Sequence, residues 1–242
     1  MSTPGKVYLI GAGPGAQDLI TLRGARLLAQ ADVVLFDALV TDEMLALCPQ
    51  AVRISVGKRS GQRSASQTTI NEQLVASARQ YALVVRLKGG DPMMFGRADE
   101  ELRALEEAGI AFEIVPGITT ALAAAAATRQ PLTKRGVARS VAFFTSSTAP
   151  EHAEQTQMPD SDTLVQYMGG REAIVTAQRL LEQGRRPGTP VIVIENCSRP
   201  DQRIMRLTLA TLADGLEATH GPVLVMLGDA MQLRETQAND AS

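Results

Sequence analysis

Short apolar runs alternate with amphipathic segments along the first half of the chain. Strand-like runs occur at residues 6–10, 33–36, 52–56, 83–87 and 112–115, and helix-like segments occur at residues 19–31, 43–47, 68–80 and 98–108. Strands separated by helices predict an α/β fold with a mainly parallel sheet. We expect Asp42 to cap the second helix and Gly109 to end the fourth.

The pattern changes after Pro116-Gly117, the expected hinge between two domains, residues 1–117 and 118–242. An alanine-rich run predicts a helix over 121–127, capped by Thr119 or Thr120. The remaining prediction comprises strands at 141–144, 163–167, 191–194, 203–207 and 223–227, a helix at 172–183, a polar mobile loop at 147–162 and a frayed tail at 232–242.

One arrangement occurs four times: an apolar, strand-like run ends on glycine. The glycines that follow these runs are Gly11, Gly89, Gly169 and Gly228. Ligands of open α/β sheets lie outside the carboxyl ends of the strands, and glycine there lets the backbone approach a ligand closely. The repeated pattern therefore predicts several ligand-facing loops and a large ligand.

Composition narrows the class of protein. The 242 residues fit one large α/β unit or two smaller domains. Aromatic residues make up only 3% and the net charge is −2, which argues against nucleic-acid and membrane-surface binding. The sequence shows neither an apolar run of membrane-spanning length nor a signal-peptide pattern. Cys48 and Cys197 are expected to be free thiols, and the protein is expected to be cytoplasmic and free of metal.

The first glycine loop, residues 11–16, fits the dinucleotide pattern G-x-G-x-x-G/A, and Asp37 follows at the spacing of a ribose ligand. On this motif alone the chain would be a flavin or nicotinamide oxidoreductase. The alternative interpretation of so short a motif is a tight turn between a strand and a helix that binds no ligand. No further redox signature accompanies the loop, and the dinucleotide interpretation leaves the specialised turn at Gly89-Gly90-Asp91-Pro92 unused.

A longer ordered set of motifs resembles the uroporphyrinogen-III C-methyltransferases of the tetrapyrrole methylase family, over about residues 5–230. The set is Gly11-Ala12-Gly13-Pro14-Gly15, Leu19-Ile20-Thr21-Leu22, Asp37, Gly57-Lys58-Arg59, Ile70-Asn71, Val85 to Pro92, Phe95-Gly96-Arg97, Val115 to Thr119, Pro131-Leu132-Thr133, Arg135-Gly136 and Tyr167-Met168-Gly169. The resemblance implies a two-domain tetrapyrrole methylase fold. Its amino-terminal sheet would be mainly parallel, its carboxy-terminal sheet mixed, and its active site would lie in the cleft between the domains.

The same resemblance implies a homodimer that moves methyl groups from S-adenosyl-L-methionine to carbons 2 and 7 of uroporphyrinogen III. The products would be S-adenosyl-L-homocysteine and precorrin-2, which feeds sirohaem and cobalamin biosynthesis. Methyl transfer to an electron-rich pyrrole carbon needs alignment and exclusion of water, and a proton must leave the methylated ring. The acceptor carries eight carboxylates, which fixed cations and backbone amides would bind.

The resemblance also assigns roles to residues. Asp37 and Lys58 would transfer protons, while Arg97, paired with Glu100 one turn along a helix, would act as a base or orient substrate. Orientation is physically easier because arginine stays protonated. The implied donor site is Pro14, Gly89, Gly90, Asp91, Met94, Thr119, Thr120, Met168 and Cys197, with Met168 also in the catalytic set. The implied acceptor site is Gly13, Arg59, Arg63, Lys134 and Arg135.

Several of these residues also have plain alternatives, namely solvated charges for the cations, core packing for the methionines and helix capping for the threonines. The chain departs from the family at four places: Ala38 replaces an arginine, and Arg63, Lys134 and Ser147 replace histidines. These changes bear on the acceptor more than on the donor. They leave two alternatives open, a methyltransferase for another precorrin-like tetrapyrrole and a non-catalytic tetrapyrrole-binding relative.

Overall fold

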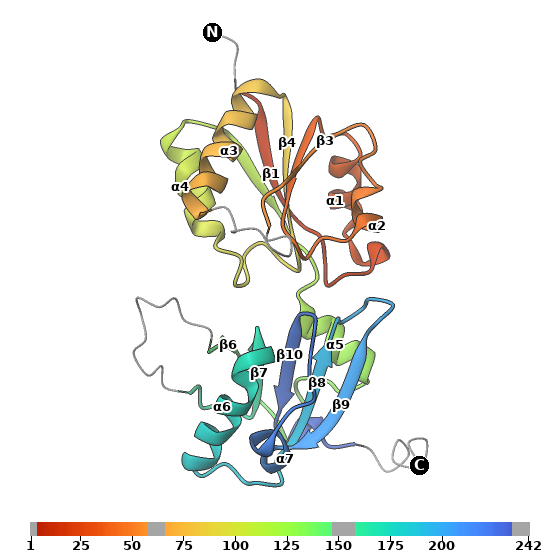
Figure 1. Ribbon diagram of the computed structural model, residues 1–242, viewed down its shortest axis with the longest axis vertical. Coiled ribbons are helices and arrows are strands. Elements are labelled where there is room, and N and C mark those ends of the chain that lie inside the picture. Colours follow the sequence, from red (N-terminus) through yellow and green to blue (C-terminus); the bar gives the residue numbers. More distant parts are fainter. Residues whose placement is uncertain (1–3, 58–65, 147–157, 234–242) are drawn as a thin grey trace. The chain divides into compact units, whose positions relative to one another are not determined.

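The computed structural model describes residues 4–57, 66–146 and 158–233 (Figure 1). The chain divides into two compact units, Met1–Thr119 and Thr120–Ser242. The boundary follows residue 119, where the sequence suggested residue 117. Within the described ranges, no helix is long and apolar enough to cross a membrane.

The first unit is a five-stranded, fully parallel sheet in the order β3-β2-β4-β1-β5. Its elements are β1 (Lys6–Gly11), the 3-10 helix η1 (Gln17–Leu19), α1 (Leu22–Leu28), β2 (Val33–Phe36), α2 (Asp42–Leu45), β3 (Val52–Ser55), α3 (Gln67–Gln80), β4 (Leu83–Lys88), α4 (Ala98–Glu107) and β5 (Phe112–Val115). A parallel sheet places the carboxyl ends of all its strands at one edge.

Helices cover both faces of this sheet, as Figure 1 shows, with α1 and α2 on one side and α3 and α4 on the other. Successive side chains of each strand point to opposite faces of the sheet, so the unit has one core layer on each face. Ile10 and Leu87 pack with Leu28 of α1 and Met44 of α2, whereas Leu9 and Val84 belong to the core that includes Leu74 of α3 and Leu105 of α4. Burial on both faces accounts for the nearly continuous apolar runs in the sequence.

The second unit is a mixed sheet in the order β6-β7-β10-β8-β9. Its elements are α5 (Thr120–Thr128), β6 (Val141–Thr145), β7 (Thr163–Tyr167), α6 (Gly169–Glu182), β8 (Pro190–Glu195), β9 (Arg203–Thr208), α7 (Leu209–Asp214), β10 (Val223–Leu227) and the 3-10 helix η3 (Asp229–Met231). Strands β6, β7 and β8 point one way, and β9 and β10 point the other. Side chains of α6 and α7 share a core with alternate residues of β10, namely Val223, Val225 and Leu227.

Three predicted helix starts are wrong. The segment 19–31 is not one helix, because Ile20 is extended and the Thr21 hydroxyl caps α1 by accepting from the amide of Gly24. Thr41 caps α2 by accepting from the amide of Met44, so Asp42 is the first helical residue and not the cap. Helix α6 begins at Gly169 and not at residue 172, because Met168 has a φ of 57° and turns the chain directly from strand into helix.

Candidate functional site

Three glycine turns of the first unit pack backbone against backbone at the carboxyl edge of the sheet. Gly13, after β1, and Gly90, after β4, exchange two hydrogen bonds, with N···O distances of 3.1 and 2.7 Å. A Cβ atom on Gly117, after β5, would lie 2.2 Å from the Gly90 carbonyl oxygen, and a Cβ atom on Gly11 would lie 2.6 Å from the Cα of Gly117. No side chain fits between these backbones, so glycine is required for the three strand ends to meet.

Two carboxylates tie the same strand ends together. Asp91 accepts hydrogen bonds from the amides of Gly117, at 2.9 Å, and Met93, at 2.8 Å. Asp37, the residue after β2, accepts from the amides of Leu39, at 2.9 Å, and Gly89, at 3.3 Å. Asp37, Gly89 and Asp91, predicted from sequence as site residues, thus form one bonded cluster.

Open space remains beside this cluster. A Cβ atom added to Gly90, whose φ is +69°, would meet nothing within 4 Å, in contrast to Gly11 and Gly117. Pro14 follows the bridged Gly13 and is partly buried, and Met94 is also partly buried, with its amide bonded to the Asp91 carbonyl. The edge therefore combines a rigid base with an accessible backbone surface at Gly90.

Arg97 and Glu100 form the ion pair predicted from their spacing. The guanidinium Nε and Nη2 atoms bond the two carboxylate oxygens at 2.7 and 2.8 Å, and the side chains of Arg97 and Glu100 are 59% and 44% exposed. These hydrogen bonds raise the pKa of Arg97 and lower the pKa of Glu100. A raised pKa favours the interpretation of Arg97 as a fixed cation that orients substrate.

A buried charged cluster lies behind these residues, and the sequence analysis did not identify it. Glu101 of α4 is fully buried and pairs with Arg86, at 3.0 Å, and with Lys88, at 2.9 Å. Burial lowers the pKa of Lys88 and the neighbouring Arg86 lowers it further, while Glu101 opposes both effects. One sequence signal was available: two cations two residues apart, on one face of a strand that is otherwise apolar and buried.

In the second unit, Met168 and Cys197 lie at the same edge of the sheet. Met168 follows β7 and Cys197 lies two residues after β8; both strands pair with the first residues of β10 there. Burial raises the pKa of Cys197 to about 11, so its thiol is neutral near pH 7 and is not a nucleophile. Met168, at 49% exposure, presents its side chain from a left-handed backbone conformation.

Thr120 is placed at this same edge by Tyr167. The Tyr167 hydroxyl accepts a hydrogen bond from the amide of Ala121, at 3.3 Å, which joins the first turn of α5 to the end of β7. Thr120, Met168 and Cys197 therefore belong to one region of the second unit. Thr119 is the last residue of the first unit.

The predicted acceptor-binding cations are not part of these clusters. Lys134 and Arg135 are exposed on a hairpin closed by the bridge between Lys134 and Ala138, which leads into the amino end of β6. Met168 follows the carboxyl end of the neighbouring parallel strand β7. Lys58, Arg59 and Arg63 lie outside the described residues, so their roles stay predictions.

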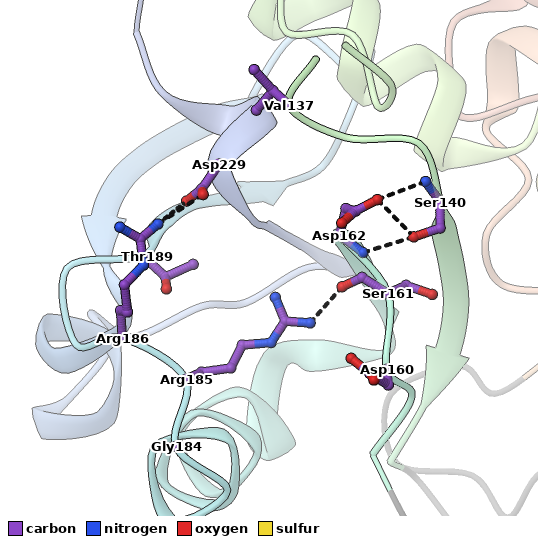
Figure 2. Close-up of a pocket in the computed structure, with 10 residues that line it drawn as sticks. All are labelled: Val137, Ser140, Asp160, Ser161, Asp162, Gly184, Arg185, Arg186, Thr189 and Asp229. Atoms are coloured by element: carbon purple, nitrogen blue, oxygen red, sulfur yellow. Dashed lines mark hydrogen bonds and ion pairs between the residues drawn. The ribbon is translucent and has the colours of Figure 1, made fainter. Parts of the chain in front are cut away.

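A cavity of about 490 Å³ occupies the opposite edge of the second sheet (Figure 2). The charged groups around it bond mostly to the protein: Arg186 pairs with both oxygens of Asp229, at 2.6 and 2.7 Å, and Asp162 accepts from the amides of Arg139 and Ser140. These contacts join the loops that precede β6, β7 and β8 to the end of β10. We call this set of contacts between loops the polar joint. Its charged groups are bonded mostly to one another and to the backbone, which leaves few of them for a ligand.

The fourth strand-to-glycine turn belongs to this joint, so it is not one of the several ligand-facing loops that the repeated pattern predicted. Strand β10 is antiparallel to β7, so Gly228 lies at the opposite edge from Gly169. A Cβ atom on Gly228 would lie 2.3 Å from the Asp162 carbonyl oxygen. The glycine at this turn serves packing between loops.

The first glycine loop also differs from a dinucleotide site. A dinucleotide pyrophosphate sits at the start of a helix that follows the loop directly. Here the loop is followed by the short η1, and α1 begins only at Leu22, after its Thr21 cap. The amide of Gly13 is already bonded to Gly90. Among the described residues, moreover, no group of three His, Cys, Asp or Glu side chains could hold a metal ion.

The fold and this set of turns define a known class of proteins. The sequence model of the tetrapyrrole (corrin/porphyrin) methylases matches residues 6–213, and the chain belongs to that family of methyltransferases. It is 38% identical to uroporphyrin-III C-methyl transferase from Thermus thermophilus, whose crystal structure in complex with S-adenyl homocysteine superposes with a TM-score of 0.80 over 94% of both chains.

Two further relatives are also similar to this chain. A cobalt precorrin-4 methyltransferase of cobalamin biosynthesis is 29% identical, with a TM-score of 0.80 over 94% of this chain and 96% of that one. The siroheme synthase of Tolumonas auensis is 44% identical over 96% of this chain, which corresponds to 50% of that protein. The chain spans about half the length of the curated relatives it matches.

Proposed function

We propose that this protein transfers methyl groups from S-adenosyl-L-methionine to carbons 2 and 7 of uroporphyrinogen III and so forms precorrin-2. The observation that carries the proposal is the bonded edge formed by Gly13, Gly90, Asp91 and Gly117. It consists of the motifs that resemble this family most strongly, and it offers an accessible backbone surface. The 38% identity to a uroporphyrin-III C-methyl transferase supports the same reaction.

The donor fits the chemistry of this edge. The donor supplies an electrophilic methyl group on a sulfonium when bound. Gly90 has open space where a side chain would otherwise stand, so backbone groups are accessible to a nucleoside or an amino acid. Each Asp91 oxygen already accepts one hydrogen bond from the backbone and retains a second lone pair for a hydroxyl or ammonium group. Met168 and Cys197 would contribute sulfur-containing, neutral surfaces to the donor.

The acceptor is a polyanion, and the residues proposed for it are cations or proton carriers. Arg97 is held in a fixed orientation by Glu100 and would pair with a substrate carboxylate. Arg59, Arg63, Lys134 and Arg135 would bind further carboxylates. Asp37, with Lys58, would remove or relay the proton that leaves the methylated ring. These residues would align the ring and exclude water, which supplies much of the rate of a displacement reaction.

A second candidate is methylation of another precorrin-like tetrapyrrole. Two observations favour it: the three histidines replaced by Arg63, Lys134 and Ser147, and the equal TM-score of the cobalt precorrin-4 methyltransferase. The donor residues would be the same in both reactions. Only the identity of the acceptor separates the two candidates.

The deciding experiment incubates the purified protein with S-adenosyl-L-methionine and uroporphyrinogen III and follows the product by mass spectrometry. A gain of two methyl groups with release of S-adenosylhomocysteine is expected. An inert acceptor, despite calorimetric binding of S-adenosylhomocysteine, would favour the second candidate. Absence of donor binding would exclude both.

Asp91→Ala tests the donor site separately. The substitution removes a carboxylate that accepts two hydrogen bonds from backbone amides, and we expect S-adenosylhomocysteine affinity to fall about tenfold, or by ~1.4 kcal/mol. The control is Asp162→Ala, which removes a comparably bonded carboxylate at the opposite edge of the second sheet. Equal affinities of the two variants would contradict the donor-site assignment. Sedimentation would test the homodimer, which remains a prediction from the family.

A further inference from the structure

Three charged side chains are buried together in the first unit. Arg86 and Lys88 point to the same face of β4 and are 4% and 3% exposed, and Glu101 of α4 is fully buried. Glu101 bonds Arg86 Nε at 3.0 Å and Lys88 Nζ at 2.9 Å. Arg86 Nη1 also donates to the carbonyls of Leu35 and Leu87. Burying two cations with one carboxylate is costly, and truncating one partner would leave an uncompensated charge.

The cluster connects two parts of the candidate site. Lys88 directly precedes Gly89, and its carbonyl accepts from the amide of Ala12 in the first glycine loop, at 2.8 Å. Glu101 directly follows Glu100, the partner of Arg97. The Lys88 side chain packs against the loop between β4 and α4, since a Cβ atom on Gly96 would lie 3.0 Å from the Lys88 Cε. The Lys88–Glu101 pair therefore links the glycine turn of β4 to the amino end of α4.

The cluster also holds a surplus of charge. Two cations face one carboxylate, which leaves one positive charge behind the site. The other charged groups that act on Lys88 are Asp37, beyond the end of β2, and Glu100 on α4. From α3, the neutral Gln67 amide approaches Glu101 at 3.5 Å. Lys58, beyond β3, lies outside the described residues.

We propose that Lys88 and Glu101 are positioning residues for the methyl transfer: their buried ion pair fixes Arg97 and Glu100 relative to the glycine turn and keeps one positive charge behind Asp37. The inference rests on the proposed function, because it assigns these two residues a role in that reaction. Neither residue touches the reacting atoms. The glycine turn is held independently by Gly13 and Asp91, so donor affinity should not depend on the pair.

The pH dependence of kcat gives the sharpest test, because two conservative variants should move it in opposite directions. Burial lowers the pKa of Lys88, so kcat of the wild type should fall on the alkaline side as its ammonium loses the proton. Lys88→Arg keeps the charge at all accessible pH values, and the alkaline limb should move to higher pH. Glu101→Gln removes the carboxylate that favours the ammonium, and the limb should move to lower pH.

Lys88→Met should lower kcat by about tenfold or more at neutral pH, while the Kd for S-adenosylhomocysteine stays within about threefold. The matched control is Lys6→Met, which removes another Lys–Glu pair, that of Lys6 with Glu113, at the amino edge of the same sheet. Its kcat and pH profile should equal those of the wild type. If Lys88→Met does not fold, as judged by thermal melting, the two conservative variants carry the test.

Failure of this inference and failure of the proposed function give different results. A wild type that does not methylate uroporphyrinogen III overturns the function. An active wild type whose alkaline limb is the same in Lys88→Arg and Glu101→Gln overturns only the positioning role. NMR titration of the Lys88 ammonium tests the pair even in an inactive protein: Glu101→Gln must move its midpoint to lower pH, and an unmoved midpoint refutes the pair.

Discussion

The tight backbone turns at the carboxyl edges of the two sheets are formed by different kinds of residue. In the first unit, Gly11, Gly90 and Gly117 stand where backbones touch. In the second unit, Met168, Asn196 and Ser198 adopt positive φ angles of 52° to 61° although glycine would adopt them without strain. Glycine thus stands at positions 11 and 117, where no side chain fits, whereas strained residues that carry side chains stand at the strand ends of the second unit. Such strain commonly marks functional sites.

Gly117→Ala should have the largest effect and tests the first half of this comparison. The added Cβ atom would meet the Gly90 carbonyl oxygen at 2.2 Å, and we expect a loss of about 3 kcal/mol in unfolding free energy. Chemical denaturation measures it. Gly188→Ala is the control, since its Cβ atom would meet nothing within 4 Å and stability should be unchanged. Equal stability of the two variants would refute the tight backbone contact.

Arg97→Lys tests the side chain of Arg97, a residue of the first unit that also has a left-handed backbone conformation. Lysine cannot make the two-pronged contact with Glu100, so kcat/KM should fall about tenfold while stability changes little. Arg103→Lys, in the exposed pair with Asp99 on the same helix, is the control and should keep full activity. Steady-state kinetics of the two variants gives the comparison, and equal kcat/KM values would remove Arg97 from the site.

Met168→Gly tests the second unit. Glycine relieves the left-handed strain, so unfolding free energy should stay constant or rise by up to ~1 kcal/mol, while methyl transfer should fall. Arg129→Gly is the control, because Arg129 has a φ of 55° just after α5 and lies outside the candidate site. That variant should show the same stability gain with full activity. Undiminished activity of Met168→Gly would show that its side chain is dispensable.

Asp162→Asn should have the smallest effect and tests the polar joint at the opposite edge. Hydrogen bonds from the Arg139 amide and from Ser140 lower the pKa of Asp162, so its contribution is present at neutral pH and disappears as the pH falls through the lowered pKa of the folded state. The melting temperature should drop by roughly 3 °C at pH 7 and converge with that of the wild type in acid. The control is Asp160→Asn, which changes another carboxylate of the same cavity and should leave the melting temperature at pH 7 unchanged.

Much of the fold was predictable because it depends on local patterns. Continuous apolar runs separated by amphipathic segments indicate a parallel sheet covered on both faces, and that is the first unit. The i to i+3 spacing of Arg97 and Glu100 predicted their ion pair correctly. Glycines after strands likewise indicated the turns that bond at the edge of the first sheet.

The remainder depends on contacts that sequence spacing does not encode. Thr41 and Asp42 are both competent caps, and only the backbone conformation decides between them. The antiparallel pairing of β10 sends Gly228 to the opposite edge, although its local sequence resembles that of Gly89. Glu101 finds Arg86 and Lys88 only through the packing of α4 on β4.

The contact among Gly11, Gly90 and Gly117 has a practical consequence for redesign of acceptor preference. Mutant libraries that randomise Gly11 and Gly117 would consist mostly of misfolded chains, because any side chain there collides with neighbouring main chain, and a side chain at Gly90 would be strained by its positive φ. Diversity is better introduced at exposed positions beside these turns, such as Met93, which is 59% exposed. The bonded glycine turns would then stay unchanged while the exposed side chains beside them vary.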